Sequence, residues 1–354
     1  MSPSTTMVTG HQAVMEALEA GLAGALGEQR AALWRLDRSA YEPTIRTRGE
    51  ATRAAVLTSA RPATAATKIV DLWWDDAEEA AALLEDVIAA AIDRGDAVVK
   101  WETGPGVEAP AFANARGFVP LRSPWSAKGT EVRGGLVLWL RDLPHHEPGY
   151  YAQTTMFTCG AVAALIASEE LGSTGFRGDS SDRDREVDFW RRASNYPACE
   201  PVGLAVAIRE DLRTVPVGVS LDVEGPVLLE DFDGFDRDFR AELQEQSWGK
   251  AEALGVPVSR TRVTVEQIAA RIVGGEIALL LIDEHPMHGT HGPHWIVAHA
   301  SDGDVVVVED PWTESDHGET WVDTHDLPIA LADLDRLVTW GDDGYRGVVF
   351  LGRG

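Results

Sequence analysis

After residue 275 the chain contains four short apolar runs, and their length constrains the fold more than any other feature. The runs are residues 276–282, 294–300, 305–310 and 347–352. Apolar runs of about 4–8 residues between turn residues are typical of buried strands. Asp302 and Gly303 separate the second run from the third and predict a hairpin.

The strands of this region alternate with helical segments. Helices are expected over residues 159–171, 184–193, 235–254 and 265–273, and a further helix is expected after Cys199 with Pro201 in its first turn. Valines and Leu221 alternate over 215–223, which predicts another strand. We therefore expect a second domain, of helices and strands, over residues 150–354.

The first half of the chain predicts two smaller regions. Apolar residues recur every four positions over 11–37 and indicate an amphipathic helix, whereas the polar stretch 38–66 is interpreted as a connector. Residues 67–143 predict a compact α/β segment. Its expected elements are strands 67–74, 97–102 and 134–141, a helix 77–95 capped by Asp75 or Asp76, and a short helix 109–118. A Pro/Gly-containing linker follows at 142–149.

Composition excludes several classes of partner. The formal charge is −26, from 31 basic and 57 acidic residues, and such a field repels nucleic acid and anionic lipid surfaces. The chain has no apolar run of the ~18 residues that a membrane span needs, and its start lacks the features of a signal peptide. We therefore predict a cytoplasmic protein with no nucleic-acid or membrane partner.

The chain has only two cysteines, Cys159 and Cys199. Two cysteines make neither a disulfide framework nor a Cys-rich zinc site, so either one acts chemically only as a thiol. Cys159 is expected at a helix start, after Thr158 as N-cap and before Gly160, which leaves room beside the sulfur. The partial positive charge of a helix N-terminus favours the thiolate.

An acyl-transfer site also needs donors for the developing oxyanion. The backbone N–H of Cys159 is one candidate donor, and the side-chain amide of Gln153, six residues upstream, is the other. The alternative is that Cys159 is a small core residue at a tight helix start. Cys199 is a second candidate thiol, but Glu200 beside it disfavours a thiolate, so we favour a packing or pocket-lining role for Cys199.

A thiol nucleophile needs a base and an orienting partner, and His294 and Asp310 lie at the same end of the predicted hairpin. A two-residue turn at Asp302-Gly303 would place them on opposite faces of the sheet. A three-residue loop with Gly303 in the left-handed region would place them on one face, and we predict that odd-length loop. The alternatives are a buried, hydrogen-bonded His294, a turn at Asp310, and a strand-face role for His299.

Four histidines, at positions 285, 288, 291 and 294, fall at every third residue. Histidine clusters bind zinc in some proteins, but these four lie in a Gly/Pro-punctuated stretch whose spacing fixes no shared metal geometry. We predict no metal ion here and interpret the stretch as a substrate-facing loop. The candidate substrate-binding residues are His291 in this loop, together with Trp295 and Cys199.

Taken together, these motifs resemble a known family. "YYAQTTMFTCG" resembles the catalytic start of the C39-like cysteine peptidases, and "HWIVAH" and "VVVVEDP" resemble their His and Asp strands. The resemblance covers nearly all of 150–352 and implies a papain-like α+β fold. It also implies that Cys159 is the nucleophile, His294 the base, Asp310 the orienting residue and Gln153 the oxyanion donor.

A second resemblance concerns the region before the linker. Residues 67–143, notably "AFANARGFVPL", resemble the C-terminal half of an N-acetyltransferase fold, as in one branch of the peptidase family. That fold holds the acetyl-CoA phosphates with a glycine-rich loop at a helix start. The matching stretch here is "LWWDDAEEAA", which has no glycine and several carboxylates. We therefore expect a degenerate half-domain that uses no cofactor.

The expected function is hydrolysis of a peptide or amide bond through an acyl-thioester on Cys159. Two alternatives stay open: an acyltransferase that passes the same acyl group to an amine, and a noncatalytic binding module. The expected partners are a peptide or a small amide or acyl substrate, together with a carrier protein or a precursor peptide.

Overall fold

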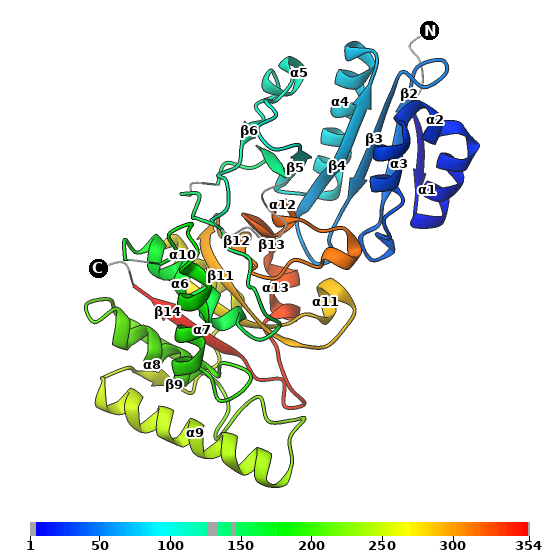
Figure 1. The fold of residues 1–354 in the computed structure, drawn as a ribbon. Coiled ribbons are helices and arrows are strands. Elements are labelled where there is room, and N and C mark those ends of the chain that lie inside the picture. The colour runs from blue at the N-terminus through cyan, green and yellow to red at the C-terminus, as the bar shows by residue number, and fades with distance from the viewer. Residues whose placement is uncertain (1–4, 126–132, 144–145, 174, 353–354) are drawn as a thin grey trace. The chain divides into compact units, whose positions relative to one another are not determined.

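The computed structural model describes residues 5–125, 133–143, 146–173 and 175–352 and separates into two compact units (Figure 1). Unit 1 comprises Met1–Ser123, Gly129–Asp142 and Thr313–Asp323, and unit 2 comprises Pro124–Lys128, Leu143–Trp312 and Thr324–Gly354. Of the predicted linker 142–149, residues 144 and 145 lie outside the described residues. Among the helices that the structure describes, none is both long and apolar enough to cross a membrane.

Unit 1 is built on a seven-stranded sheet with the strand order β1-β2-β3-β4-β5-β7-β6. Only the pair β4–β5 is parallel, and the other neighbours are antiparallel. The strands are β1 (Thr6–Thr9), β2 (Thr44–Arg48), β3 (Ala54–Ser59), β4 (Ala66–Trp74), β5 (Val98–Thr103), β6 (Val119–Pro120) and β7 (Gly134–Trp139). The predicted strands at 67–74, 97–102 and 134–141 are confirmed.

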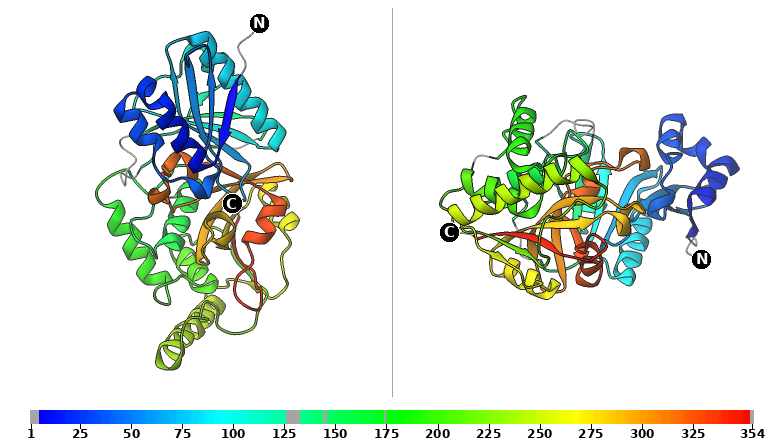
Figure 2. Two further views of the ribbon diagram at one scale, coloured as in Figure 1. Left: turned by 90° about the vertical axis from the view of Figure 1, so that its right-hand side faces the viewer. Right: turned by 90° about the horizontal axis from the view of Figure 1, so that it is seen from below.

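Helices cover both faces of this sheet (Figure 2). On one face lie α4 (Ala77–Arg94) and α5 (Ala111–Asn114), and on the other α1 (His11–Ala17), the π-helical turn η1 (Leu18–Leu22), α2 (Ala23–Leu26) and α3 (Glu28–Trp34). The single helix predicted over 11–37 is therefore interrupted. The breaks fall at Gly21 and Gly27, whose φ angles of 127° and 78° do not fit a helix.

The prediction of a connector over residues 38–66 is wrong, because this stretch supplies β2 and β3 to the sheet. Every residue of β3 is buried, since helices cover both faces of the strand. A strand buried on both sides shows no alternation of polar and apolar residues, and the small residues of β3 gave no strong apolar run. The sheet of unit 1 thus begins well before residue 67.

Residues 313–323 follow the predicted Asp strand of the peptidase domain but pack within unit 1. Arg61 holds Glu319 with two bonds of 2.7 and 2.6 Å, and both side chains are buried. Lys68 is buried between Glu102, at 2.7 Å, and Asp323. Because a buried charge is tolerated only when it is paired, these contacts fix the segment in unit 1. The predicted domain 150–354 is therefore interrupted in space.

Unit 2 contains a second seven-stranded sheet, of order β13-β12-β11-β10-β14-β8-β9, in which only β8–β9 is parallel. The strands are β8 (Val217–Leu221), β9 (Val258–Ser259), β10 (Ile277–Asp283), β11 (Pro293–Ser301), β12 (Val305–Glu309), β13 (Leu327–Ala330) and β14 (Gly347–Leu351). All four apolar runs that follow residue 275 are strands of this sheet, as predicted.

The helices of unit 2 are α6 (Cys159–Glu170), α7 (Asp182–Ala193), α8 (Pro201–Asp211), α9 (Gly234–Ala253), α10 (Val265–Val273), α11 (His285–His288) and α13 (Leu331–Leu337). Helix α6 is apolar all round, and its residues from Cys159 to Ser168 are all buried. It packs with α8 against strands β10, β11 and β14, and the shared core includes Leu279, Trp295 and Val349. This packing brings the start of α6 to the sheet that carries the predicted His and Asp.

In the hairpin β11–β12, the strand register is set by a different feature from the one predicted. Three residues, 302–304, lie between the strands and Gly303 has a φ of 95°, as predicted. However, Ser301 pairs with Val306, so the loop alone does not bring His294 and Asp310 to one face. Further from the loop, Val297 pairs with Glu309, because the register shifts by one residue at a bulge that contains His299. A bulge inserts one extra residue into one strand and reverses the parity of the pairing. The bulge therefore places His294 and Asp310 on one face of the sheet, as the loop was expected to do.

Candidate active site

Cys159 is the first residue of α6 and is 9% exposed. The first N–H groups of a helix have no acceptor within the helix, so they favour an anion placed beside them. Thr158 is the N-cap residue but makes no side-chain cap. Its hydroxyl instead donates to Glu186 at 2.5 Å. The start of α6 is therefore not closed by its own N-cap side chain.

Glu186 of α7 organises the loop before Cys159 and was missed by the sequence analysis. This fully buried carboxylate accepts hydrogen bonds from the hydroxyls of Tyr151 (3.1 Å), Thr154 (2.8 Å) and Thr158, and from the backbone N–H of Thr154 (2.8 Å). A sequence signal existed: Glu186 shares a helix face with the apolar Phe189 and Ala193. A carboxylate at such a position needs buried donors.

Gln153 is held deep in the same loop. Its backbone N–H donates to the Pro311 carbonyl at 2.9 Å, and its side-chain Nε2 donates to the Thr155 carbonyl at 2.7 Å. A carboxamide nitrogen carries two hydrogens, so one remains for another acceptor. The loop that carries Gln153 is thereby joined to the chain directly after Asp310.

His294 and Asp310 meet as predicted, with 2.7 Å between Nε2 and Oδ1. Both are buried, at 3% and 1% exposed. The Cys159 side chain lies beside the His294 ring, since it is one of the groups that raise the pKa of the imidazole. Because Nε2 is engaged by Asp310, Nδ1 is the ring nitrogen left for the sulfur. The three predicted residues are thus gathered at one place, from α6, β11 and the end of β12.

Electrostatics at this place favour a protonated imidazole. Burial opposes the charged ring, but the carboxylates of Asp310 and Glu284 and the hydrogen bonds of the ring to Asp310 and Cys159 outweigh it and hold the pKa of His294 well above its usual range. Glu284 lies 3.8 Å from Nδ1 and was not predicted.

Asp310 is fixed by its neighbours. Its backbone N–H donates to the Thr324 carbonyl at 3.0 Å, and its carbonyl accepts from the Tyr150 hydroxyl at 3.1 Å. The Thr324 hydroxyl donates to Tyr150 at 2.7 Å, and the Asp310 carboxylate also accepts from the Trp312 N–H at 2.9 Å. These bonds hold the carboxylate toward His294 and suit an orienting role.

Cys199, Trp295 and Gly160 form a packed group behind the candidate nucleophile. Trp295 donates from its indole nitrogen to the Cys199 carbonyl at 2.9 Å, and a Cβ on Gly160 would lie 2.9 Å from Cys199 Cβ and 3.1 Å from Trp295 Cδ1. The room that Gly160 leaves is therefore filled by these two side chains. Burial, with the nearby Cys159 and Glu200, raises the pKa of Cys199 well above its usual value. For Cys199 and Trp295 substrate contact stays a prediction, since what is seen is packing.

The other loop histidines lie apart from this group of three. His291 is exposed, lies 2.6 Å from Asp283, and stacks on His285 with 4.2 Å between the ring centroids. His294 is buried in the sheet, whereas His285 and His291 are exposed, so these three histidines do not meet at one place. Substrate contact by His291 stays a prediction.

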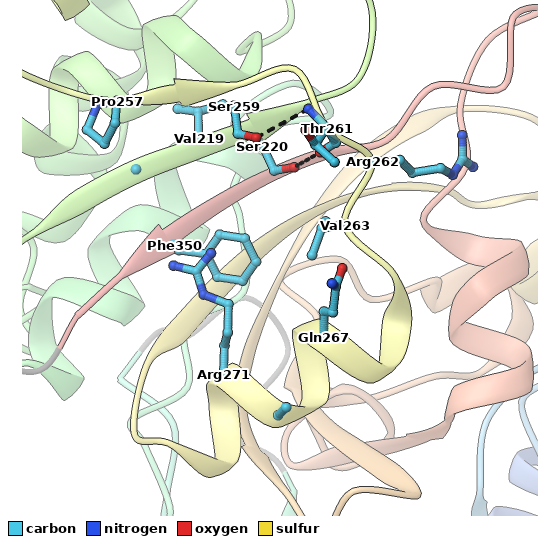
Figure 3. Close-up of a pocket in the computed structure, with 12 residues that line it drawn as sticks. Val219, Ser220, Pro257, Ser259, Thr261, Arg262, Val263, Gln267, Arg271 and Phe350 are labelled. Atoms are coloured by element: carbon cyan, nitrogen blue, oxygen red, sulfur yellow. Dashed lines mark hydrogen bonds between the residues drawn. The ribbon is translucent and has the colours of Figure 1, made fainter.

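Two pockets among the described residues lie away from Cys159. One, of about 540 Å³, is lined by residues of β8, β14 and α10, including Ser220, Gln267 and Arg271 (Figure 3). The other, of about 860 Å³, lies in unit 1 where β4 and β5 diverge, and its lining includes Asp71, Glu102 and Arg133. None of the predicted catalytic residues lines either pocket.

Comparisons with known proteins begin with unit 1. The chain is similar to an IAA acetyltransferase from Bacillus cereus (14% identity, TM-score 0.28, 39% of this chain and 100% of that one). It is also similar to the ribosomal-protein-S18-alanine N-acetyltransferase from Escherichia coli (14%, 0.28, 44% and 100%) and to a putative GNAT-family acetyltransferase from Desulfovibrio desulfuricans (13%, 0.30, 39% and 100%). Because the TM-scores are below 0.5, these likenesses establish nothing about what this chain does.

A comparison with protein families concerns the second part of the chain. No curated protein matches the chain. A family model described as the "Peptidase_C39 like family" matches residues 148–352, which is more than half of the chain. The match spans all the residues that meet at the start of α6. The chain belongs to the Peptidase_C39 like family.

Proposed function

We propose that the protein is a cysteine-dependent hydrolase that cleaves a peptide or amide bond through an acyl-thioester on Cys159. The observation that carries this proposal is the group of three: a thiol at a helix N-terminus lies beside His294, whose Nε2 is 2.7 Å from Asp310. The family match supports it, since the family is named for a peptidase.

The first half of the proposed reaction forms the acyl-enzyme. The Cys159 thiolate attacks the carbonyl carbon of the substrate, and the resulting oxyanion accepts hydrogen bonds from the Cys159 N–H and the Gln153 amide. The His294 imidazolium then gives its proton to the nitrogen of the leaving amine as the carbon–nitrogen bond breaks. Asp310 keeps the ring oriented and stabilises its positive charge.

In the second half, neutral His294 takes a proton from a water molecule that attacks the thioester. The carbon–sulfur bond breaks, the carboxylic acid leaves, and the thiolate–imidazolium pair is restored. If an amine attacks instead of water, the same steps give a new amide, and the protein is an acyltransferase. Water and an amine compete for the same acyl-enzyme. Analysis of the product therefore shows whether the protein is a hydrolase or an acyltransferase.

Exposed aromatic side chains close to Cys159 in the sequence support an acyl group with an apolar part. Phe157, two residues before Cys159, lies 4.7 Å from the Trp190 ring, which in turn lies 5.3 Å from Tyr196. Phe157 and Tyr196 are 39% and 41% exposed, and Met156 is 85% exposed. Such a cluster of exposed apolar groups is typical of a binding surface. That the protein acts in the cytoplasm, with a carrier protein or precursor peptide, stays a prediction.

The proposal is tested by trapping the acyl-enzyme. The full chain is incubated with a panel of acyl p-nitrophenyl esters and then analysed by intact-protein and peptide mass spectrometry. We expect one acyl group on Cys159, its loss in Cys159→Ala, and its retention in Cys199→Ala, which removes the only other thiol. Addition of glycinamide then separates hydrolysis, which gives the acid, from acyl transfer, which gives the amide. The proposal is refuted by an adduct that persists in Cys159→Ala. It is also refuted by a folded wild type that neither carries an adduct nor releases p-nitrophenol faster than Cys159→Ala.

A further inference from the structure

A second group of ionisable side chains lies in the interior of unit 2, outside the proposed catalytic residues. His299 Nε2 lies 3.3 Å from Asp326 Oδ1 and 3.5 Å from Glu309 Oε1. The three residues are 7%, 1% and 0% exposed, and their donor atoms lie within 4.8 Å of one another. We propose that His299, Glu309 and Asp326 bind a divalent transition-metal ion, with Zn²⁺ as the first candidate.

The separations between these atoms carry the proposal. Hydrogen bonds between nitrogen and oxygen are typically about 2.7–3.2 Å long, so the two ion pairs that His299 makes are long ones. Zinc binds imidazole nitrogen and carboxylate oxygen at about 2.0–2.2 Å, so two such ligands in a tetrahedral site are roughly 3.3–3.5 Å apart. The observed 3.3 and 3.5 Å match atoms that face one common ion.

The ligand types narrow the choice of ion. Imidazole favours zinc and other first-row metals, whereas carboxylates also suit manganese. One imidazole with two carboxylates therefore fits Zn²⁺ or Mn²⁺ better than Mg²⁺ or Ca²⁺, which prefer oxygen ligands throughout. A dication would replace the proton of His299 as the positive charge that faces these two buried carboxylates.

Surrounding contacts orient the proposed ligands. Glu309 Oε2 lies 2.8 Å from His325 Nδ1, and His325 Nε2 lies 2.9 Å from Glu147. Glu309 Oε1 also accepts the Asp326 backbone N–H at 2.9 Å. Ligands in metal sites are commonly held by such outer hydrogen bonds between carboxylates and histidines. His325 thus acts as a positioning residue for Glu309 and not as a ligand.

The backbone at the two ends of the site is also specialised. His299 lies in the bulge of β11, and bulges re-aim a side chain within a sheet. Asp326 has a φ of 50°, a left-handed conformation that few non-glycine residues adopt. An ion at this place would join β11 and β12 to residues 324–326, which lead into β13. The backbone N–H of Asp310 donates to the Thr324 carbonyl in that same segment.

The test begins with metal content. The full chain is stripped with EDTA, re-equilibrated with Zn²⁺ or Mn²⁺ in separate arms, desalted and analysed by inductively coupled plasma mass spectrometry. We expect one ion per chain and a higher melting temperature than that of the stripped protein. If neither ion is retained, the proposal is overturned, and a protonated His299 between two carboxylates explains the geometry.

Variants then locate the ion. Asp326→Asn keeps the shape of the side chain but removes its charge, and we expect it to weaken metal binding by about 100-fold or more. The matched control is His285→Ala combined with His291→Ala, which removes two exposed histidines from the same unit and should keep one ion per chain. Retention of the ion in a folded Asp326→Asn, or its loss in the control, overturns the proposal.

A spectroscopic measurement on the wild type covers the case in which Asp326→Asn fails to fold. The stripped chain is loaded with Co²⁺ and examined by X-ray absorption. We expect one imidazole together with oxygen ligands. A spectrum with two or more imidazoles, or with none, contradicts the assignment. These tests are independent of the reaction at Cys159, because metal content, melting temperature and X-ray absorption do not depend on catalytic activity.

Discussion

The starts of two helices, one in each unit, show how similar local structures come to have different chemistry. At the start of α4, the Asp76 carboxylate accepts the N–H groups of Glu78 and Glu79 at 2.9 and 3.3 Å. At the start of α6, Thr158 makes no cap, and its hydroxyl is bound to Glu186 instead. One helix start is satisfied by its own carboxylate, whereas the other keeps its N–H groups for an anion at Cys159.

The surroundings of the two helix starts strengthen this difference. Helix α4 has Glu78 and Glu79 in its first turn, so an anionic ligand would meet like charges. Helix α6 has no acidic residue in its first turn, and a histidine that carries a raised pKa contacts Cys159. An anionic ligand is therefore disfavoured at the first site, whereas the first turn at the second site carries no negative side chain. This accounts for our prediction that unit 1 uses no acetyl-CoA, while unit 2 activates a thiol.

The largest effect that tests this comparison is expected from His294→Ala. Without the imidazolium, only the helix start favours the thiolate, and at pH 6 a thiol of ordinary pKa is roughly 0.3% ionised. We expect the rate of iodoacetamide labelling of Cys159 at pH 6 to fall on the order of 100-fold. His146→Ala, which removes an exposed histidine of the same unit, is the control and should leave the rate unchanged. Equal rates in the wild type and His294→Ala would break the comparison.

A smaller effect is expected when the glycine after Cys159 is replaced. Gly160→Ala places a methyl group 2.9 Å from Cys199 Cβ, and such overpacking costs about 1–3 kcal/mol of unfolding free energy. The matched glycine is Gly249 of α9, where an added Cβ meets nothing within 4 Å. Gly249→Ala should stabilise the protein by about 0.5–1 kcal/mol. Chemical denaturation measures both, and equal effects would contradict the packing described for Gly160.

Asp76→Ala tests the closed helix start. Loss of an N-cap carboxylate costs about 1 kcal/mol, so the unfolding midpoint of unit 1 should fall while Cys159 labelling stays constant. Isothermal titration should find no tight acetyl-CoA binding to the wild type. Tight binding there would show that the carboxylates of α4 do not exclude a pyrophosphate, and the contrast between the two helix starts would lose its meaning.

The smallest effect concerns pH. The folded pKa of His294 is raised, so its protonation stabilises the folded state. This contribution is fully present below the unfolded pKa of about 6.5 and is lost as pH rises through the higher folded pKa. The stability gap between the wild type and His294→Gln should therefore narrow from pH 6 to pH 10. Thermal melts at several pH values measure it, and a gap that widens would mean that the histidine is neutral when buried.

The sequence was most informative where apolar runs and chemistry coincide. The strands after residue 275, the helix start at Cys159 and the meeting of His294 with Asp310 were all predicted. The feature that brings His294 and Asp310 to one face was not predicted. The length of the loop was expected to do this, whereas the structure uses a bulge at His299. Bulges of this kind need no glycine, so the residues around His299 carry no local signal for one.

What the sequence could not show depends on contacts between distant residues. Strand β3 lacks alternation because both of its faces are covered. The position of 313–323 in unit 1 depends on ion pairs with Arg61 and Lys68, which are about 250 positions away in the chain. The role of Glu186 likewise depends on hydroxyls from another loop. No window of neighbouring residues contains this information.

One measurement tests the central claim most directly: site-resolved iodoacetamide labelling of the native chain at pH 6, compared with the urea-unfolded chain. Because Cys159 lies at an open helix start beside an imidazolium, and burial raises the pKa of Cys199, the account predicts rapid labelling of Cys159, on the order of 100-fold faster than in the unfolded chain. It predicts that Cys199 labels more slowly than in the unfolded chain. Labelling of Cys159 no faster than in the unfolded chain would contradict the account.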